Sequence, residues 1–192
     1  ITVADGRATV ATTSTIVAPN PGWFFSTSSV VDIKKDTNHD LTAVMKQQVQ
    51  QLNFELTVTE NNINDISQVL ASLSGIANSI DLKDGTYSGT GLKIEPVFSK
   101  NGDKLIASVR LIGLTSEVQN LTLDITYENG STQQIVTDVS SRLISFGTDK
   151  HIPMVLKGNI SISKLDVTFN SEISNWGTWY IMPNIDLEED EF

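Results

Sequence analysis

The chain has 192 residues and carries a net charge of −10, from 23 acidic and 13 basic residues, so it would repel a phosphate backbone and nucleic-acid binding is not expected. Val, Ile and Thr together number 55, against 24 for Ala and Leu, which favours pleated sheet over helix. No apolar run approaches the ~20 residues that cross a bilayer. The sequence therefore predicts an all-β globular protein, only mildly acidic apart from the five acids within residues 186–191.

The first half of the chain contains two predicted strands and one ambiguous segment. Residues 8–18 are small, branched and uncharged, and predict a long strand that ends at the Pro-Asn-Pro-Gly sequence of residues 19–22. After a polar loop at residues 34–40, apolar and polar residues alternate over 52–59, which predicts a half-buried strand. Residues 66–77 fit both helical and strand spacing, and Gly75 interrupts either pattern, so periodicity leaves both readings open.

The second half shows clearer hairpin signals. Alternating segments flank Asn101-Gly102 and again Asn129-Gly130, and an Asn-Gly pair readily adopts the positive φ angles of a tight turn. Further strands are expected at 160–169 and up to the aromatic cluster at 176–180. We place a domain boundary in the Gly-containing stretch near residue 90, giving one β-sandwich over residues 1–90 and a second, with the acidic tail, over 91–192.

Residues suited to catalysis or metal binding are scarce. The chain has two histidines and no cysteine, and His39 and His151 lack a positioned partner in the sequence, so we interpret both as surface or turn residues. Asp36, Asn38 and Asp40 begin like a calcium loop, but the Gly and Glu expected further on are missing. The sequence therefore predicts neither an enzyme nor a metal or cofactor site.

The tryptophans offer a different kind of site. Trp176 and Trp179 are three residues apart in a predicted strand, so they point to opposite faces and one is expected at the surface. An exposed Trp can stack on a sugar or anchor a protein partner, whereas a buried one contributes core area. Trp23 and Trp179 are thus candidate ligand aromatics of a secreted glycan-binding module.

Three segments together resemble a known family. They begin at Met45 (MKQQVQQLNFEL), Leu73 (LSGIANSIDLKDG) and Leu121 (LTLDITYENG), the last followed by Asp138-Val-Ser. Their order and spacing are similar to those of the fimbrillin-like surface lipoproteins of Bacteroidetes, of the minor-fimbria anchor subunit type, from about Met45 to Trp179.

The resemblance implies two tandem transthyretin-like Greek-key sandwiches and a strand at 66–77. It also implies export to the cell surface, attachment to the outer membrane through an N-terminal lipid on a Cys that this chain does not contain, and other fimbrial subunits as partners. A host glycan or protein is a further ligand to test. The start at Ile1, without Met or a signal sequence, is interpreted as a processed or trimmed end.

In the family, proteolysis after an Arg frees a groove that the C-terminal extension of the next subunit fills by strand pairing. The resemblance implies assembly candidates at both ends of the chain: Arg7, Ala8 and Val10, and then Ile181, Ile185 and Leu187. The C-terminal series is short and interrupted by Pro183, which makes a poor donor strand. We therefore expect an anchor or accessory subunit, with the glycan-binding module as the alternative and an extracellular hydrolase ranked last.

Overall fold

The computed structural model describes residues 1–35, 38, 40–60, 62–161 and 173–180, with residues 60 and 173–180 described by their backbone alone. Strands dominate these residues, and the two helices are single 3-10 turns, η1 (Ile63–Asp65) and η2 (Ser140–Arg142). The predicted all-β class is confirmed. No helix in this part of the chain has the length and apolar character needed to cross a bilayer.

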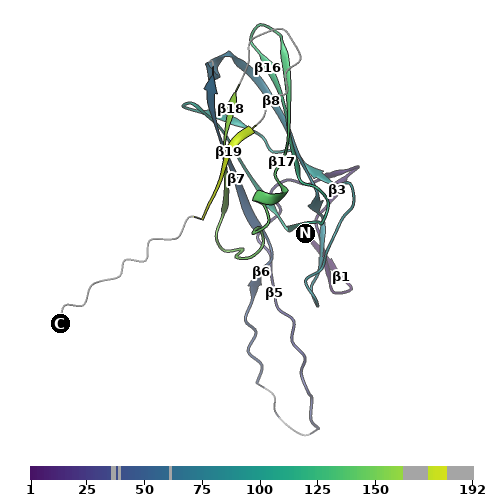
Figure 1. Ribbon diagram of the computed structural model, residues 1–192. Coiled ribbons are helices and arrows are strands. Elements are labelled where there is room, and N and C mark those ends of the chain that lie inside the picture. The colour runs from purple at the N-terminus through teal and green to yellow at the C-terminus, as the bar shows by residue number, and fades with distance from the viewer. Residues whose placement is uncertain (36–37, 39, 61, 162–172, 181–192) are drawn as a thin grey trace, which may run out of the picture.

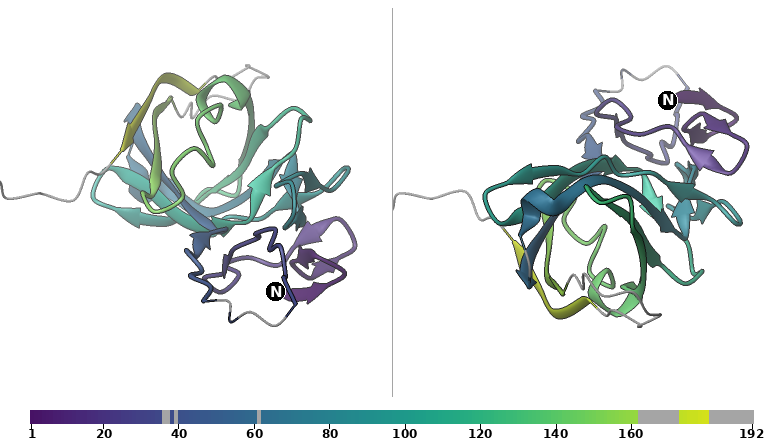
Figure 2. Two further views of the ribbon diagram at one scale, coloured as in Figure 1. Left: turned by 90° about the horizontal axis from the view of Figure 1, so that it is seen from below. Right: turned by 90° about the horizontal axis from the view of Figure 1, so that it is seen from above.

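Two large sheets face each other across the core (Figures 1 and 2). The first contains, in spatial order, β17 (Thr132–Asp138), β16 (Asn120–Tyr127), β8 (Ile66–Ser74), β12 (Lys93–Ile94), β4 (Ile16–Val17) and β3 (Thr12–Thr13). The second contains β13 (Ser99–Asn101), β14 (Lys104–Leu111), β7 (Gln50–Glu60), β18 (Met154–Ser161) and β19 (Ile173–Tyr180). Pairing is antiparallel except between β7 and β18 and between β4 and β12.

Three small sheets lie around this sandwich. One consists of β1 (Thr2–Ala4), β2 (Arg7–Thr9), β10 (Ser79–Asp81) and β11 (Tyr87–Ser88). The other two are the pairs β9 (Ile76–Ala77) with β15 (Gly113–Leu114), and β5 (Phe25–Ser26) with β6 (Lys46–Gln47).

Alternation along the long strands builds the core. In β7, Leu52, Phe54 and Leu56 are almost fully buried, while the residues between them are partly exposed. The same alternation in β14 and β16 places their apolar residues against those of β7 and β8 in one hydrophobic cluster. Each strand thus buries one face and leaves the other wetter, as its sequence pattern predicts.

The sheets cross the position predicted to separate two domains. β7 and β8 precede residue 90, yet β7 pairs with β14 and β18, and β8 pairs with β16. In place of separate sandwiches at 1–90 and 91–192, the described strands form one sandwich from both parts of the chain. Turn signals locate strand ends but carry no information on which strands pair, which is why the Gly-containing stretch was mistaken for a boundary.

Other local predictions have mixed outcomes. Both Asn-Gly hairpins are present, as β13–β14 and β16–β17, with positive φ at Gly102 and Gly130. Residues 66–77 form β8 and β9, separated at Gly75, whose φ is +71°. The long strand predicted at 8–18 is wrong, because the chain turns back at Ser14 (φ +56°) and leaves only the short strands β2, β3 and β4.

Candidate assembly surface

The N-terminal seam, residues 7–17, packs the start of the chain against the sandwich. β2 lies between β1 and β10, with Ala8 opposite Ile80. Ala8 is fully buried and Val10 is 3% exposed, and the Val10 N–H donates to the carbonyl oxygen of Asn78 at 2.7 Å. The seam therefore contributes both side chains and backbone pairing to the core.

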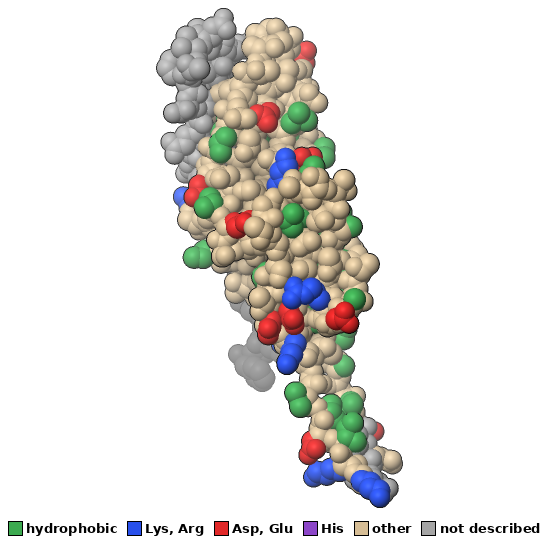
Figure 3. Space-filling model, turned by 90° about the vertical axis from the view of Figure 1, so that its right-hand side faces the viewer, with side chains coloured by type: hydrophobic (Ala, Val, Ile, Leu, Met, Phe, Trp, Pro, Cys, Tyr) green, Lys and Arg blue, Asp and Glu red, His purple; other side chains and the backbone are tan. Residues whose placement is uncertain are grey.

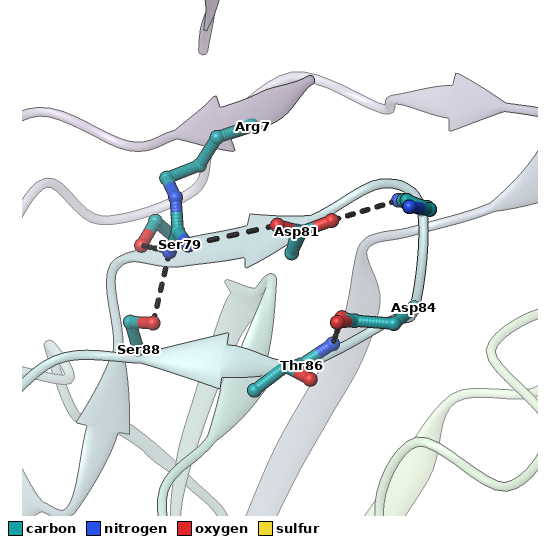
Figure 4. Close-up of polar contacts among 7 residues, drawn as sticks. Arg7, Ser79, Asp81, Asp84, Thr86 and Ser88 are labelled. Atoms are coloured by element: carbon teal, nitrogen blue, oxygen red, sulfur yellow. Dashed lines mark hydrogen bonds and ion pairs between the residues drawn. The ribbon is translucent and has the colours of Figure 1, made fainter. Parts of the chain in front are cut away.

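Arg7 ties this seam to two neighbouring strands (Figure 4). Its Nη1 donates to Ser88 Oγ at 2.9 Å and to Ser79 Oγ at 3.3 Å, and its Nη2 lies 3.7 Å from Asp81 Oδ2. The guanidinium is part-exposed, so the ion pair contributes little by itself. Its geometric effect is to link β2 to β10 and β11 at once.

Two carboxylates accept backbone hydrogen bonds within the turn between β10 and β11, next to the residues that Arg7 contacts (Figure 4). Asp81 Oδ1 accepts from the Lys83 N–H at 2.9 Å, and Asp84 Oδ1 accepts from the Thr86 N–H at 2.8 Å. Hydrogen bonding to Thr86 lowers the pKa of Asp84 below its ordinary value. The carboxylates thus stabilise the turn, as short acidic side chains commonly do.

A sheet edge with no partner among the described strands lies elsewhere, at β17. Among the described strands β17 pairs only with β16. The Tyr127 N–H donates to the Ser131 carbonyl, and the Val139 N–H donates to the Gln119 carbonyl, so the odd-numbered residues of β17 are the hydrogen-bonded ones. The backbone groups of Thr132, Gln134, Val136 and Asp138 therefore point away from β16.

This edge has few of the features that usually prevent another strand from adding to it, since Asp138 is its one charged residue. β17 has the sequence TQQIVTD, with no Lys and no Pro, and its register with β16 runs without a bulge over seven residue pairs. Natural edge strands are commonly short, charged, bulged or interrupted by Pro. The outward backbone groups of β17 therefore have no partner strand among the described residues.

Trp23 lies at the surface and is 49% exposed. The Arg110 Cζ lies 5.2 Å from the centre of its ring, a cation–π arrangement. The backbone N–H and guanidinium of Arg110 donate to Asn20 at 3.1 and 3.0 Å, which holds the Pro-Asn-Pro-Gly turn against β14. Trp23 is thus fixed in position with part of its ring still accessible.

The structure brings together Arg7, Ala8 and Val10 but does not relate them to the remaining candidates. Trp179 lies in β19 opposite Val155, and its side chain is outside the described part of the structure. Ile181, Ile185 and Leu187 lie outside the described residues altogether, so they remain predictions. The β17 edge was missed because edge position follows from the order of strands in the sheet, which the sequence of a single strand does not reveal.

Groups suited to hydrolysis are not assembled in the part of the chain that the structure describes. No cluster of three or more potential metal ligands is found there. The carboxylates with resolved pKa shifts, Asp84 and Asp138, are both shifted downward by hydrogen bonds, from Thr86 and Ser140, whereas a general acid needs a raised pKa. His151 is exposed in a turn, as expected, and His39 lies outside the described residues.

Comparisons with known proteins identify a family that matches most of the chain. The profile of a family described as fimbrillin-A associated anchor proteins Mfa1 and Mfa2 matches residues 2–181. No curated protein sequence matches the chain.

Two solved structures share the fold. The fimbrial anchor protein Mfa2 from Porphyromonas gingivalis is 16% identical with a TM-score of 0.55, over 90% of this chain and 65% of that one. A candidate adhesin from Bacteroides ovatus is 15% identical with a TM-score of 0.56, over 84% of this chain and 61% of that one. The chain therefore spans less than two thirds of the length of either structure.

Proposed function

The chain belongs to the family of fimbrillin-A associated anchor proteins, and from that premise we propose that it is a non-enzymatic fimbrial subunit of the cell surface. It acts as an anchor or accessory subunit and assembles with other fimbrial subunits through β-strand pairing. Attachment to the outer membrane, through a lipid on a Cys that this chain lacks, is part of the proposal. The fold shared with Mfa2 of Porphyromonas gingivalis supports it.

The observation that carries the proposal is the edge of β17, which has no second partner strand in the described part of the chain. Outward N–H and C=O groups of four residues are available to a partner strand, and β-augmentation takes its affinity from such main-chain groups. The side chains alternate, with Ile135 fully buried and Val136 55% exposed, so an added strand would meet a mixed polar and apolar surface. A partner with an extended segment fits this edge better than a small ligand does.

The N-terminal seam supports the anchor or accessory role over that of a stalk subunit. Cleavage after Arg7 needs β2 to leave β1 and β10 first, because the peptide bond lies inside a strand paired on both sides. The bonds from Arg7 to Ser79 and Ser88 oppose that opening. We therefore propose that Arg7 holds β2 in place between β1 and β10.

A proline scan of β17 tests the assembly surface. Val136→Pro removes an outward N–H and leaves the pairing with β16 intact, so the variant folds but does not co-assemble with fimbrial subunits in the producing cell. Val136→Thr keeps the N–H and is the matched control, expected to assemble normally. Ile135→Pro breaks the bond to β16 and is expected to destabilise the fold. Normal incorporation of a folded Val136→Pro variant into fimbriae would reject strand pairing at this edge.

Glycan binding is the second candidate, favoured by the half-exposed ring of Trp23. Arg110 over the ring provides a donor beside the aromatic surface, a combination that suits sugar hydroxyls. A glycan array probed with the intact chain and with Trp23→Ala tests it. Binding that disappears in the variant would support this function, and the absence of binding by the intact chain would remove it. Trp179 remains a predicted contributor.

A further inference from the structure

An arm between β5 and β6, described at residues 27–35, 38 and 40–45, leaves the sandwich and projects well beyond it (Figure 1). The two-residue strands β5 and β6 pair at its base, with Phe25 opposite Gln47. Beyond them, residues 27–33 and 40–45 make no backbone hydrogen bond to another described residue. These backbone groups are therefore left to water or to a partner.

The arm concentrates large apolar side chains at the surface. Val30 is 103% exposed, Val44 72% and Leu41 69%, and Ile33 and Met45 are also exposed. The space-filling view shows apolar side chains along this narrow projection (Figure 3). Exposed apolar residues scattered singly need no explanation, but five within sixteen residues on one projection mark an interaction site.

The charge of the arm favours contact with a second copy of the chain over contact with a lipid surface. Residues 23–47 carry three acids and three bases, so they are neutral within a chain of net charge −10. Such a segment is not repelled by a second acidic copy. A lipid surface fits less well, because Asp32 and Asp40 lie among the apolar residues and would have to enter the bilayer.

The chain itself carries a matching acceptor. The edge strand β17 has seven residues, about 23 Å of extended chain, and residues 27–33 in the first leg of the arm are long enough to span it. Both have backbone groups without a strand partner on at least one side. The arm points away from β16 and β17 of its own molecule, so pairing between these elements joins different copies (Figure 1).

We infer that residues 27–33 of one copy add as a strand to β17 of a second copy. This inference rests on the proposed function, since it uses the same acceptor edge. The contact is heterologous, with different surfaces on the two copies.

Engineered cysteines test the contact in a chain that has none of its own. In a centred register Ser29 or Val31 lies opposite residue 136, depending on strand direction. We would mix a size-tagged Val136→Cys chain with untagged Ser29→Cys or Val31→Cys chains under mild oxidation. The matched control is Ser108→Cys, an exposed position on β14. The expected result is a mixed disulfide several-fold more abundant with residue 29 or 31 than with residue 108.

Sedimentation velocity of the intact chain provides the second readout. The wild type is expected to form larger species as concentration rises, and replacement of residues 27–45 by a short Gly-Ser linker to abolish them without lowering Tm. A wild type that stays monomeric, or cross-links no better than the control, would overturn the inference. So would a monomer that floats with neutral phospholipid vesicles through its arm. If Val136→Pro blocks fimbrial co-assembly while arm removal does not, the proposed function stands and this inference fails.

Discussion

The N-terminal seam and the arm are two β-prone, weakly charged segments within the first 45 residues, and they have opposite environments. Val10 in the seam is 3% exposed, whereas Val30 in the arm is 103% exposed. The seam pairs with β10, and its Arg7 donates a hydrogen bond to Ser88. The described residues of the arm beyond β5 and β6 pair with no strand. Similar local propensity thus leads to opposite outcomes, because only the seam lies beside a sheet that its side chains can complete.

The largest expected effect compares the same substitution in the two regions. Val10→Asp places an unpaired charge in the core and should lower the free energy of unfolding by about 3 kcal/mol or more. Val30→Asp changes a fully exposed side chain and should leave the free energy of unfolding within about 0.5 kcal/mol of the wild-type value. Urea unfolding measures both, and equal effects at the two positions would contradict the contrast.

A smaller effect is expected when the seam is loosened without disturbing the core. Ser79→Ala with Ser88→Ala removes the two hydroxyls that accept from Arg7, at a cost of about 1 kcal/mol per hydrogen bond at most. Opening of β2 then becomes more frequent, so an arginine-specific protease should cleave after Arg7 several-fold faster than in the wild type. Mass spectrometry follows the cleavage. A wild type cut as fast as the variant would show that Arg7 does not retain the strand.

The smallest effect concerns Tyr127, beside the β17 edge with which the arm is inferred to pair. Tyr127, at the end of β16 next to the β17 hairpin, is 5% exposed, and burial raises its pKa to about 12. Because the folded state disfavours the phenolate, this contribution to stability is complete below pH about 10 and is lost as pH rises toward about 12. Absorbance titration should show a step from Tyr127 near pH 12. Tyr127→Phe should remove that late step, and a late step that persists would refute the assignment.

Local sequence patterns predicted much of the fold. The alternation around Leu52 and the Asn-Gly signals gave β7 and both hairpins, because side-chain period and turn chemistry act between neighbours in sequence. The first turn itself is shifted by one residue, with Gly102 and Asp103 between paired Asn101 and Lys104. The family resemblance, and not periodicity, resolved residues 66–77 as strand.

What failed depended on contacts distant in sequence. The pairing of β7 with β18, about one hundred residues later, joined the two predicted domains into one sandwich. Likewise, nothing local distinguishes β17 from an interior strand, since only the order of the sheet makes it an edge. The site residues predicted at Arg7, Ala8 and Val10 are brought together, but their contacts with Ser79 and Ser88 could not be derived from spacing.

Hydrogen exchange at β17 tests the assembly account most directly. The outward amides of Gln134 and Val136 should exchange rapidly in the isolated subunit, while the amide of Ile135, bonded toward β16, exchanges slowly. In assembled fimbriae containing this chain, the account predicts strong protection of Gln134 and Val136 and little change at Ile135. Outward amides that exchange equally fast before and after assembly would contradict strand pairing at this edge.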